Sequence, residues 1–148
     1  KYYGFDVEAS LQFSDSIDLR SVASIVRGKR KDISDDLYRI SPDNLLLAVD
    51  YHRNNWSTSF ETVFYASQNH VSQTNLEAET DGYTVVNLTG RWNVSPDLEL
   101  GAGINNLLDE EYEDHLSGYN RAYNPDIATG DRLPGLGRSL YARMMWYF

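Results

Sequence analysis

The sequence has no cysteine and no apolar run long enough for a transmembrane helix. The first absence excludes a disulfide framework and a thiolate metal site. The second excludes a helical membrane span, which needs about 20 apolar residues. Positively charged residues are outnumbered by negatively charged ones, and the 148 residues carry a net charge of −9. A nucleic-acid partner is therefore not expected, since phosphate binding requires clustered lysine and arginine.

Signals for secretion and for catalysis are missing as well. The opening "KYYGFDVEAS" has no initiator methionine and lacks the apolar core of a signal peptide. It begins directly with a strand-like pattern, so we expect a piece of a longer protein. Neither a G-x-S-x-G elbow nor an H-E-x-x-H zinc motif occurs. We therefore expect no enzymatic activity and no cofactor.

Alternation of apolar and polar residues is the dominant pattern, and it is typical of β-strands. "GFDVEASLQF" places five apolar residues on one face and four polar residues on the other. Similar segments predict seven strands, at about 3–13, 18–29, 44–53, 56–67, 82–93, 97–106 and 138–148. Each has about ten residues or slightly more, whereas ordinary strands have about five or six. A tilted strand needs about nine to eleven residues to cross a bilayer.

The connections between these strands alternate in length. The first, third and fifth are the short, turn-rich stretches "SDSI", "RNN" and "NVSPD". The others are long, at about 30–43, 68–81 and 107–137. Outer-membrane barrels have short periplasmic turns at one rim and long extracellular loops at the other. The sequence therefore predicts an all-β fold: an antiparallel transmembrane β-barrel fragment with its C-terminus at the periplasmic rim.

The last strand shows the same two faces. Leu140, Ala142, Met144, Trp146 and Phe148 alternate on the face that we expect to meet lipid. Trp146 and Phe148 are predicted to anchor the strand in the aromatic belt at the lipid–water boundary. The alternative is a C-terminal edge strand in a soluble core, which the sorted loops disfavour. Five charged residues alternate away from the apolar faces and are expected to face the lumen: Glu8, Glu61, Arg91, Glu99 and Arg143.

Five motifs in order resemble the C-terminal barrel of the TonB-dependent outer-membrane receptors. They are "YYGFDVEASLQFS", "DLYRISPDNLLLAVDY", "YTVVNLTGRW", "LGAGINNLLDEEYEDHLS" and "GLGRSLYARMMWYF". The fourth is similar to the family pattern G-x-x-N-L-x-D-x-x-Y, here Gly103, Asn106, Leu107, Asp109 and Tyr112. The fifth resembles a P-G-R ending, with Gly137 and Arg138 in place but the proline displaced to Pro134. The resemblance covers essentially the whole chain.

The resemblance implies that residues 1–148 are about the last seven strands of a 22-stranded barrel. The plug domain and earlier strands would lie elsewhere in the full-length protein. The implied function is uptake of a scarce nutrient across the outer membrane of a Gram-negative bacterium, as a metal ion, a ferric siderophore or a similar chelate. The implied partners are outer-membrane lipid, the plug, the TonB system and the barrel assembly machinery. A passive porin or an adhesive barrel is the alternative function.

The candidate ligand residues lie in an acidic segment. His115 follows Glu113 and Asp114 in "DEEYEDHLSGYN", and His70 lies at the base of another long loop. Imidazole and carboxylate groups together can bind a transition metal, so His115 is the candidate metal ligand. "EDHLSGYN" also resembles receptors associated with copper or zinc. The alternative is a solvated acidic loop with one surface histidine.

The family-motif residues have a structural interpretation instead. Asn106, Asp109 and Tyr112 come where a strand ends and a loop begins, and Asn and Asp side chains bind nearby backbone at such points. Arg138 lies near the outer end of the last strand and is expected to pair with a lumen or loop carboxylate. A ligand-binding role for Arg138 is the alternative.

Overall fold

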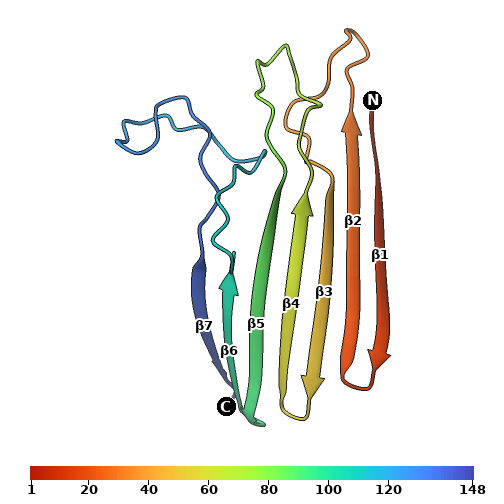
Figure 1. Cartoon of the computed structure of the whole chain (residues 1–148), viewed down its shortest axis with the longest axis vertical. Coiled ribbons are helices and arrows are strands. Elements are labelled where there is room, and N and C mark those ends of the chain that lie inside the picture. The colour runs from red at the N-terminus through yellow and green to blue at the C-terminus, as the bar shows by residue number, and fades with distance from the viewer.

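The computed structural model describes all residues, 1–148, as one seven-stranded antiparallel sheet (Figure 1). The strands are β1 (Tyr2–Ser14), β2 (Ile17–Gly28), β3 (Asn44–Arg53), β4 (Trp56–Tyr65), β5 (Tyr83–Ser95), β6 (Leu98–Asn105) and β7 (Ser139–Trp146). The predicted all-β fold and strand number are confirmed. No helix in this structure is long and apolar enough to cross a membrane.

Two strands end two residues earlier than predicted, and β5 ends two residues later, at Ser95 rather than at residue 93. β4 ends at Tyr65 rather than at residue 67, and β7 ends at Trp146 rather than at residue 148. Tyr147 still donates its backbone N–H to the carbonyl of Asp97 at 2.9 Å, so only one ladder bond extends past the strand. Phe148 follows without a pairing partner.

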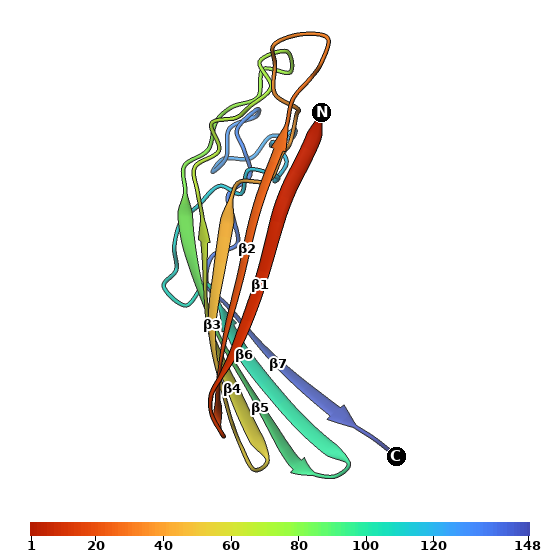
Figure 2. The same cartoon turned by 90° about the vertical axis from the view of Figure 1, so that its right-hand side faces the viewer.

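Each strand pairs with its neighbours in the sequence, in the order β1 to β7. β1 and β7 do not pair with each other, so the sheet is open at both edges. Figure 2 shows that it is strongly twisted, with the ends of β5 to β7 swung away from those of β1 to β4. Twist of this kind follows from the right-handed twist of individual strands. An unpaired edge presents free N–H and C=O groups that can pair with another strand.

Connections sort by length between the two rims, as predicted. The turns at residues 15–16, 54–55 and 96–97 lie at one rim together with the C-terminus (Figure 1). Asn54 has φ of 52°, the left-handed conformation that asparagine tolerates in tight turns. The loops at residues 29–43, 66–82 and 106–138 lie at the opposite rim. We name them loop A, loop B and loop C in that order.

Strand register separates an apolar face from a polar face. One row across all seven strands is wholly apolar: Leu11, Leu19, Val49, Phe60, Leu88, Ile104 and Leu140. The next residue along each strand gives a row on the opposite face, with no aliphatic side chain: Gln12, Asp18, Asp50, Ser59, Thr89, Gly103 and Tyr141. The five charged residues predicted for the lumen all lie on this polar face.

The apolar face is left uncovered. Phe5 is 66% exposed and Leu140 is 76% exposed, and only four hydrophobic residues are buried in the whole chain. Near the short-turn rim this face carries a band of large rings: Phe13, Tyr51, Trp56, Trp92 and Trp146. A soluble core would bury these side chains. A lipid bilayer suits them instead, because its hydrocarbon core can contact the apolar row and its interface can contact the band of rings.

Candidate functional site

Loops A, B and C are held together by a buried polar cluster. Most of the buried polar side chains of the chain lie in it: Gln68, Ser72, Glu77, Thr80, His115 and Arg132. Buried polar atoms without partners are costly, and none occurs here. The cluster therefore fixes how the three loops lie relative to one another, because each of its bonds constrains a loop.

His115 lies at the centre of this cluster and is 1% exposed. Its Nδ1 atom is 3.0 Å from the Thr80 hydroxyl, and its Nε2 atom is 3.2 Å from Oε1 of Glu77. Burial lowers the pKa of His115 below its usual 6.5, an effect that nearby Glu77 opposes and Arg132 reinforces. The ring is thus a neutral link between loop B and loop C.

Glu77 extends the link to loop A. Its carboxylate accepts backbone N–H bonds from Arg39 in loop A and Ser72 in loop B, both at 2.8 Å. Arg39 also donates its guanidinium N–H to the carbonyl of Leu116 in loop C. One buried carboxylate consequently contacts all three loops.

Arg132 closes loop C onto loop B. Its guanidinium donates to the carbonyl of His115 at 2.5 Å, the carbonyl of Ala78 at 3.1 Å and the hydroxyl of Tyr119 at 2.9 Å. The same group lies over the Tyr119 ring, 4.9 Å from its centroid. Arginine suits this position because its planar fork carries five donors.

Asp35 connects loop A to loop B a second time. It accepts bonds from the Ser72 hydroxyl and from the backbone of Gln73 and Thr74, at 2.8 to 3.1 Å. These bonds, with Thr74 making the largest contribution, hold the pKa of Asp35 well below its usual range. The carboxylate therefore stays ionised and keeps its bonds under mildly acidic conditions.

The predicted ligand residues are not brought together as a metal site. His115 is buried, whereas Glu113 is largely exposed and lies 3.8 Å from the Arg132 guanidinium. Asp114 accepts the N–H of Leu116 at 2.7 Å, and His70 is exposed in loop B. No group of three or more histidine, aspartate or glutamate side chains in the chain is arranged to hold a metal ion.

Motif residues at the β6 end have clear structural contacts. Asn106 is 2% exposed with φ of 51°, and its side chain binds the backbone of Glu110 and Leu136. Asp109, also at positive φ, accepts the backbone and guanidinium N–H groups of Arg138 at 2.8 and 3.1 Å. These bonds from Arg138 lower the pKa of Asp109.

The family motifs contain four further residues: Gly103, Leu107, Tyr112 and Gly137. A Cβ atom on Gly103 would lie 2.5 Å from the Tyr141 ring, so only glycine fits beneath it. Leu107 donates its N–H to Val86 at 2.7 Å. Tyr112 stacks on Tyr83 with ring centroids 4.2 Å apart, and a Cβ on Gly137 would lie 3.3 Å from Asp109.

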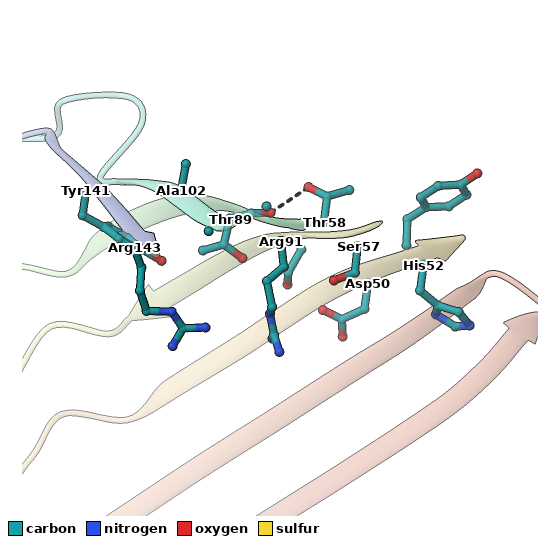
Figure 3. A pocket seen from close by; sticks show the side chains of 13 residues that line it. Asp50, His52, Ser57, Thr58, Thr89, Arg91, Ala102, Tyr141 and Arg143 are labelled. Carbon is teal, nitrogen blue, oxygen red and sulfur yellow. Dashed lines mark hydrogen bonds between the residues drawn. The ribbon is translucent and has the colours of Figure 1, made fainter. Parts of the chain in front are cut away.

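A cavity of about 420 Å³ lies on the polar face of β3 to β7 (Figure 3). Asp50, His52, Arg91 and Arg143 project into it from β3, β5 and β7. Figure 3 shows these four side chains on one side of the sheet, with Ala102 and Thr58 on the other. The sequence predicted that Arg91 and Arg143 face the lumen but gave no sign that they share a cavity.

Sequence reasoning also missed Glu77 and Arg132. Neither residue is singled out by the sequence pattern, because nothing in the local sequence marks it as buried. Their partners lie 38 and 17 residues away, so no short motif could reveal the contacts.

Solved structures of a copper transporter, a ferric enterobactin receptor and a ferric-catecholate import receptor share the fold of this chain. Copper transporter OprC superposes with a TM-score of 0.92 at 22% identity, over 99% of this chain and 23% of that one. A mutant of the ferric enterobactin receptor PfeA from Pseudomonas aeruginosa gives a TM-score of 0.75 at 20% identity, over 98% of this chain and 22% of that one. Fiu, the ferric-catecholate import receptor of K12 E. coli, gives 0.64 at 16% identity, over 97% and 20%. The chain thus spans less than a quarter of each.

Comparison with curated protein sequences gives no match. The model of one family, described as TonB dependent receptor-like, beta-barrel, matches residues 1–107. That match covers well over half of the chain, and the resemblance seen in the sequence is confirmed. The chain belongs to the TonB-dependent receptor β-barrel family.

Proposed function

We propose that the full-length protein is an outer-membrane receptor of a Gram-negative bacterium that imports a scarce nutrient with energy from the inner membrane. The observation that carries this proposal combines two features. The sheet has one apolar face and one polar face, and at one rim loops A, B and C are bonded together into a single cap. The apolar face suits lipid, the polar face suits a lumen, and the cap suits ligand capture outside the cell. Family membership favours transport over catalysis.

Residues 1–148 supply the C-terminal segment of the barrel in this proposal. An open sheet of seven strands needs the remaining strands for closure. The rest of the full-length chain would provide them, together with the plug that fills the lumen and contacts the TonB system. Lipid and the barrel assembly machinery are the proposed partners during insertion, through Trp146 and Phe148.

Loop charge favours a cation as the cargo. Loop B has three carboxylates and no lysine or arginine, and loop C has seven carboxylates against three arginines. Loop A is balanced, with four charges of each sign. A surface field of one sign attracts ligands of the other sign and raises their association rate. A ferric catecholate is an anion, so the acidic loops disfavour it relative to a metal cation.

Copper is the first cation to test, because the copper transporter OprC has the same fold over 99% of this chain. Among the predicted ligand residues, Glu113, Asp114 and His70 lie outside the buried cluster and can meet a cation at the loop surface. His115 would reach a ligand only if the loops opened, since both its ring nitrogens have partners.

Uptake measurements on cells with and without the full-length gene test this proposal. Radiolabelled copper, zinc and a ferric catecholate would be compared at limiting concentration. We expect gene-dependent uptake of copper or zinc, and a fall in its rate when Glu113 and Asp114 are both changed to the amides. Gene-dependent uptake of the ferric catecholate alone would contradict the cation proposal while leaving the receptor in place.

A further inference from the structure

The cavity on the polar face contains an arginine without a partner. Arg20, Arg91 and Arg143 all lie on this face of the strands. Arg20 pairs with Asp50 at 2.6 Å, and Arg143 pairs with Glu99 at 2.6 Å. Arg91 makes no ion pair and no side-chain hydrogen bond with any part of the chain. A guanidinium is always charged and has five N–H donors, so Arg91 has full capacity for an acceptor.

Strand register places Arg91 beside Gly101, a position on the polar face that has no side chain. One row across the five strands β3 to β7 reads His52, Ser57, Arg91, Gly101 and Arg143. Gly101 has no side chain, and an added Cβ there would meet nothing closer than 3.7 Å. Arg91 and Arg143 flank this glycine from the two adjacent strands, so their backbones are about 10 Å apart. The result is a pit in the wall with a guanidinium on each side.

The donors around this pit match a carboxylate. Arg143 uses one N–H group for Glu99, and its other N–H groups have no partner. The Ser57 hydroxyl lines the same cavity and makes no hydrogen bond of its own. Guanidinium groups bind carboxylates with two parallel bonds, which are stronger than bonds between neutral groups. The nearby Asp50 carboxylate is already satisfied by Arg20.

We propose that the pit between Arg91 and Arg143, over Gly101, binds a carboxylate. This inference rests on the proposed function, in which the polar face is the lumen wall. Covering an unpaired guanidinium with another part of the protein is costly unless a charge partner accompanies it. An acidic side chain from the part of the full-length chain that precedes residue 1 is therefore the preferred source. A free carboxylate in the lumen water is the other source with the same chemistry.

Hydrogen exchange on the purified full-length receptor distinguishes the two sources. Two variants should remove the site without unfolding the sheet: Arg91→Gln removes the unpaired donor group, and Gly101→Val fills the pit. Two matched controls lie on the opposite face, namely Arg53→Gln in β3 and Gly90→Val in β5, where an added Cβ meets nothing closer than 4.0 Å. Exchange is read separately for the sheet and for peptides that precede residue 1.

If a side chain of the preceding part fills the pit, exchange of those peptides rises about tenfold or more in both site variants and in neither control, as expected for loss of a charged hydrogen bond. If that exchange is unchanged but succinate at millimolar concentration raises the melting temperature of the wild type and not of Arg91→Gln, the carboxylate site stands with its source in solution. If neither effect occurs, the inference is wrong. None of these readings needs transport, so failure of the proposed uptake function is detected separately.

Discussion

The Nε2 atom of His115 lies 3.2 Å from Oε1 of Glu77, and this contact joins two loops whose residues are 38 positions apart. Both side chains are almost fully buried, at 0% and 2% exposure. The histidine that the sequence offered as a ligand is thus the link that gives the loop cap its shape. Any cargo-binding surface at this rim depends on that shape.

Removing the carboxylate of Glu77 should loosen all three loops. Glu77→Ala leaves the N–H groups of Arg39 and Ser72 without their acceptor. Each buried donor left unsatisfied costs about 1–3 kcal/mol. We expect faster hydrogen exchange in loops A, B and C of the full-length receptor and no change in the strands. Glu79→Ala is the matched control, because Glu79 is exposed and its side chain makes no hydrogen bond. Equal effects of the two variants would show that Glu77 does not hold the three loops together.

Acid should loosen the same cap through His115. Its pKa is lowered in the folded loops by burial, so the unfolded loops bind a proton more readily. The neutral ring therefore contributes stability that is complete above about pH 6.5 and is lost as the pH falls toward the lowered pKa. We expect loop protection, corrected for intrinsic exchange, to fall as the pH drops below about 6.5. His115→Gln should remove this dependence, and a pH profile unchanged by that substitution would exclude His115 as its cause.

Gly103 and Tyr141 should behave as one unit. A methyl group at residue 103 would lie 2.5 Å from the Tyr141 ring. Gly103→Ala is expected to lower the amount of folded receptor in the outer membrane, judged by heat-modifiable mobility. Tyr141→Ala in addition should restore much of it by vacating the space. The adjacent-strand variant Gly90→Ala should be harmless, and failure of the double variant to recover would show that the ring contact is not the constraint.

The terminal ring should matter for insertion. Phe148 lies beyond β7 at the short-turn rim, next to the aromatic band that includes Trp146. Phe148→Asp costs at most about 1 kcal/mol near the membrane interface. A large fall in outer-membrane receptor would therefore indicate lost recognition by the assembly machinery. Phe148→Tyr keeps an aromatic ring and serves as the control; unchanged insertion of the aspartate variant would end the anchoring argument.

Sequence alternation was sufficient to predict the strands because membrane sheets keep a strict period of two over long segments. Every strand expected was found, and the charged residues from Glu8 to Arg143 fell on the predicted face. The shortfall at residues 147 and 148 arose because the partner strand β6 begins at Leu98, leaving little backbone to pair with.

Loop contacts were not predictable in the same way. His115, Glu77 and Arg132 come from separate turns without periodicity, and their burial depends on how three loops pack. In the sequence, a histidine among carboxylates that binds a metal cannot be distinguished from one that links loops. Asn106 follows a strand end, and its side chain binds local backbone at Glu110, as such a position favours. Asp109 instead binds Arg138 at the far end of loop C, which is a pairing of Arg138 with a loop carboxylate as expected.

Under the proposed function, the full-length protein imports its cargo with energy from the inner membrane. The most direct measurement is radiolabelled copper uptake by cells carrying the full-length gene, with the inner-membrane potential intact or collapsed by a protonophore. We expect gene-dependent accumulation that stops when the potential is collapsed, while binding at the cell surface persists. Accumulation that is gene-dependent but unaffected by the protonophore would contradict it and identify a passive pore.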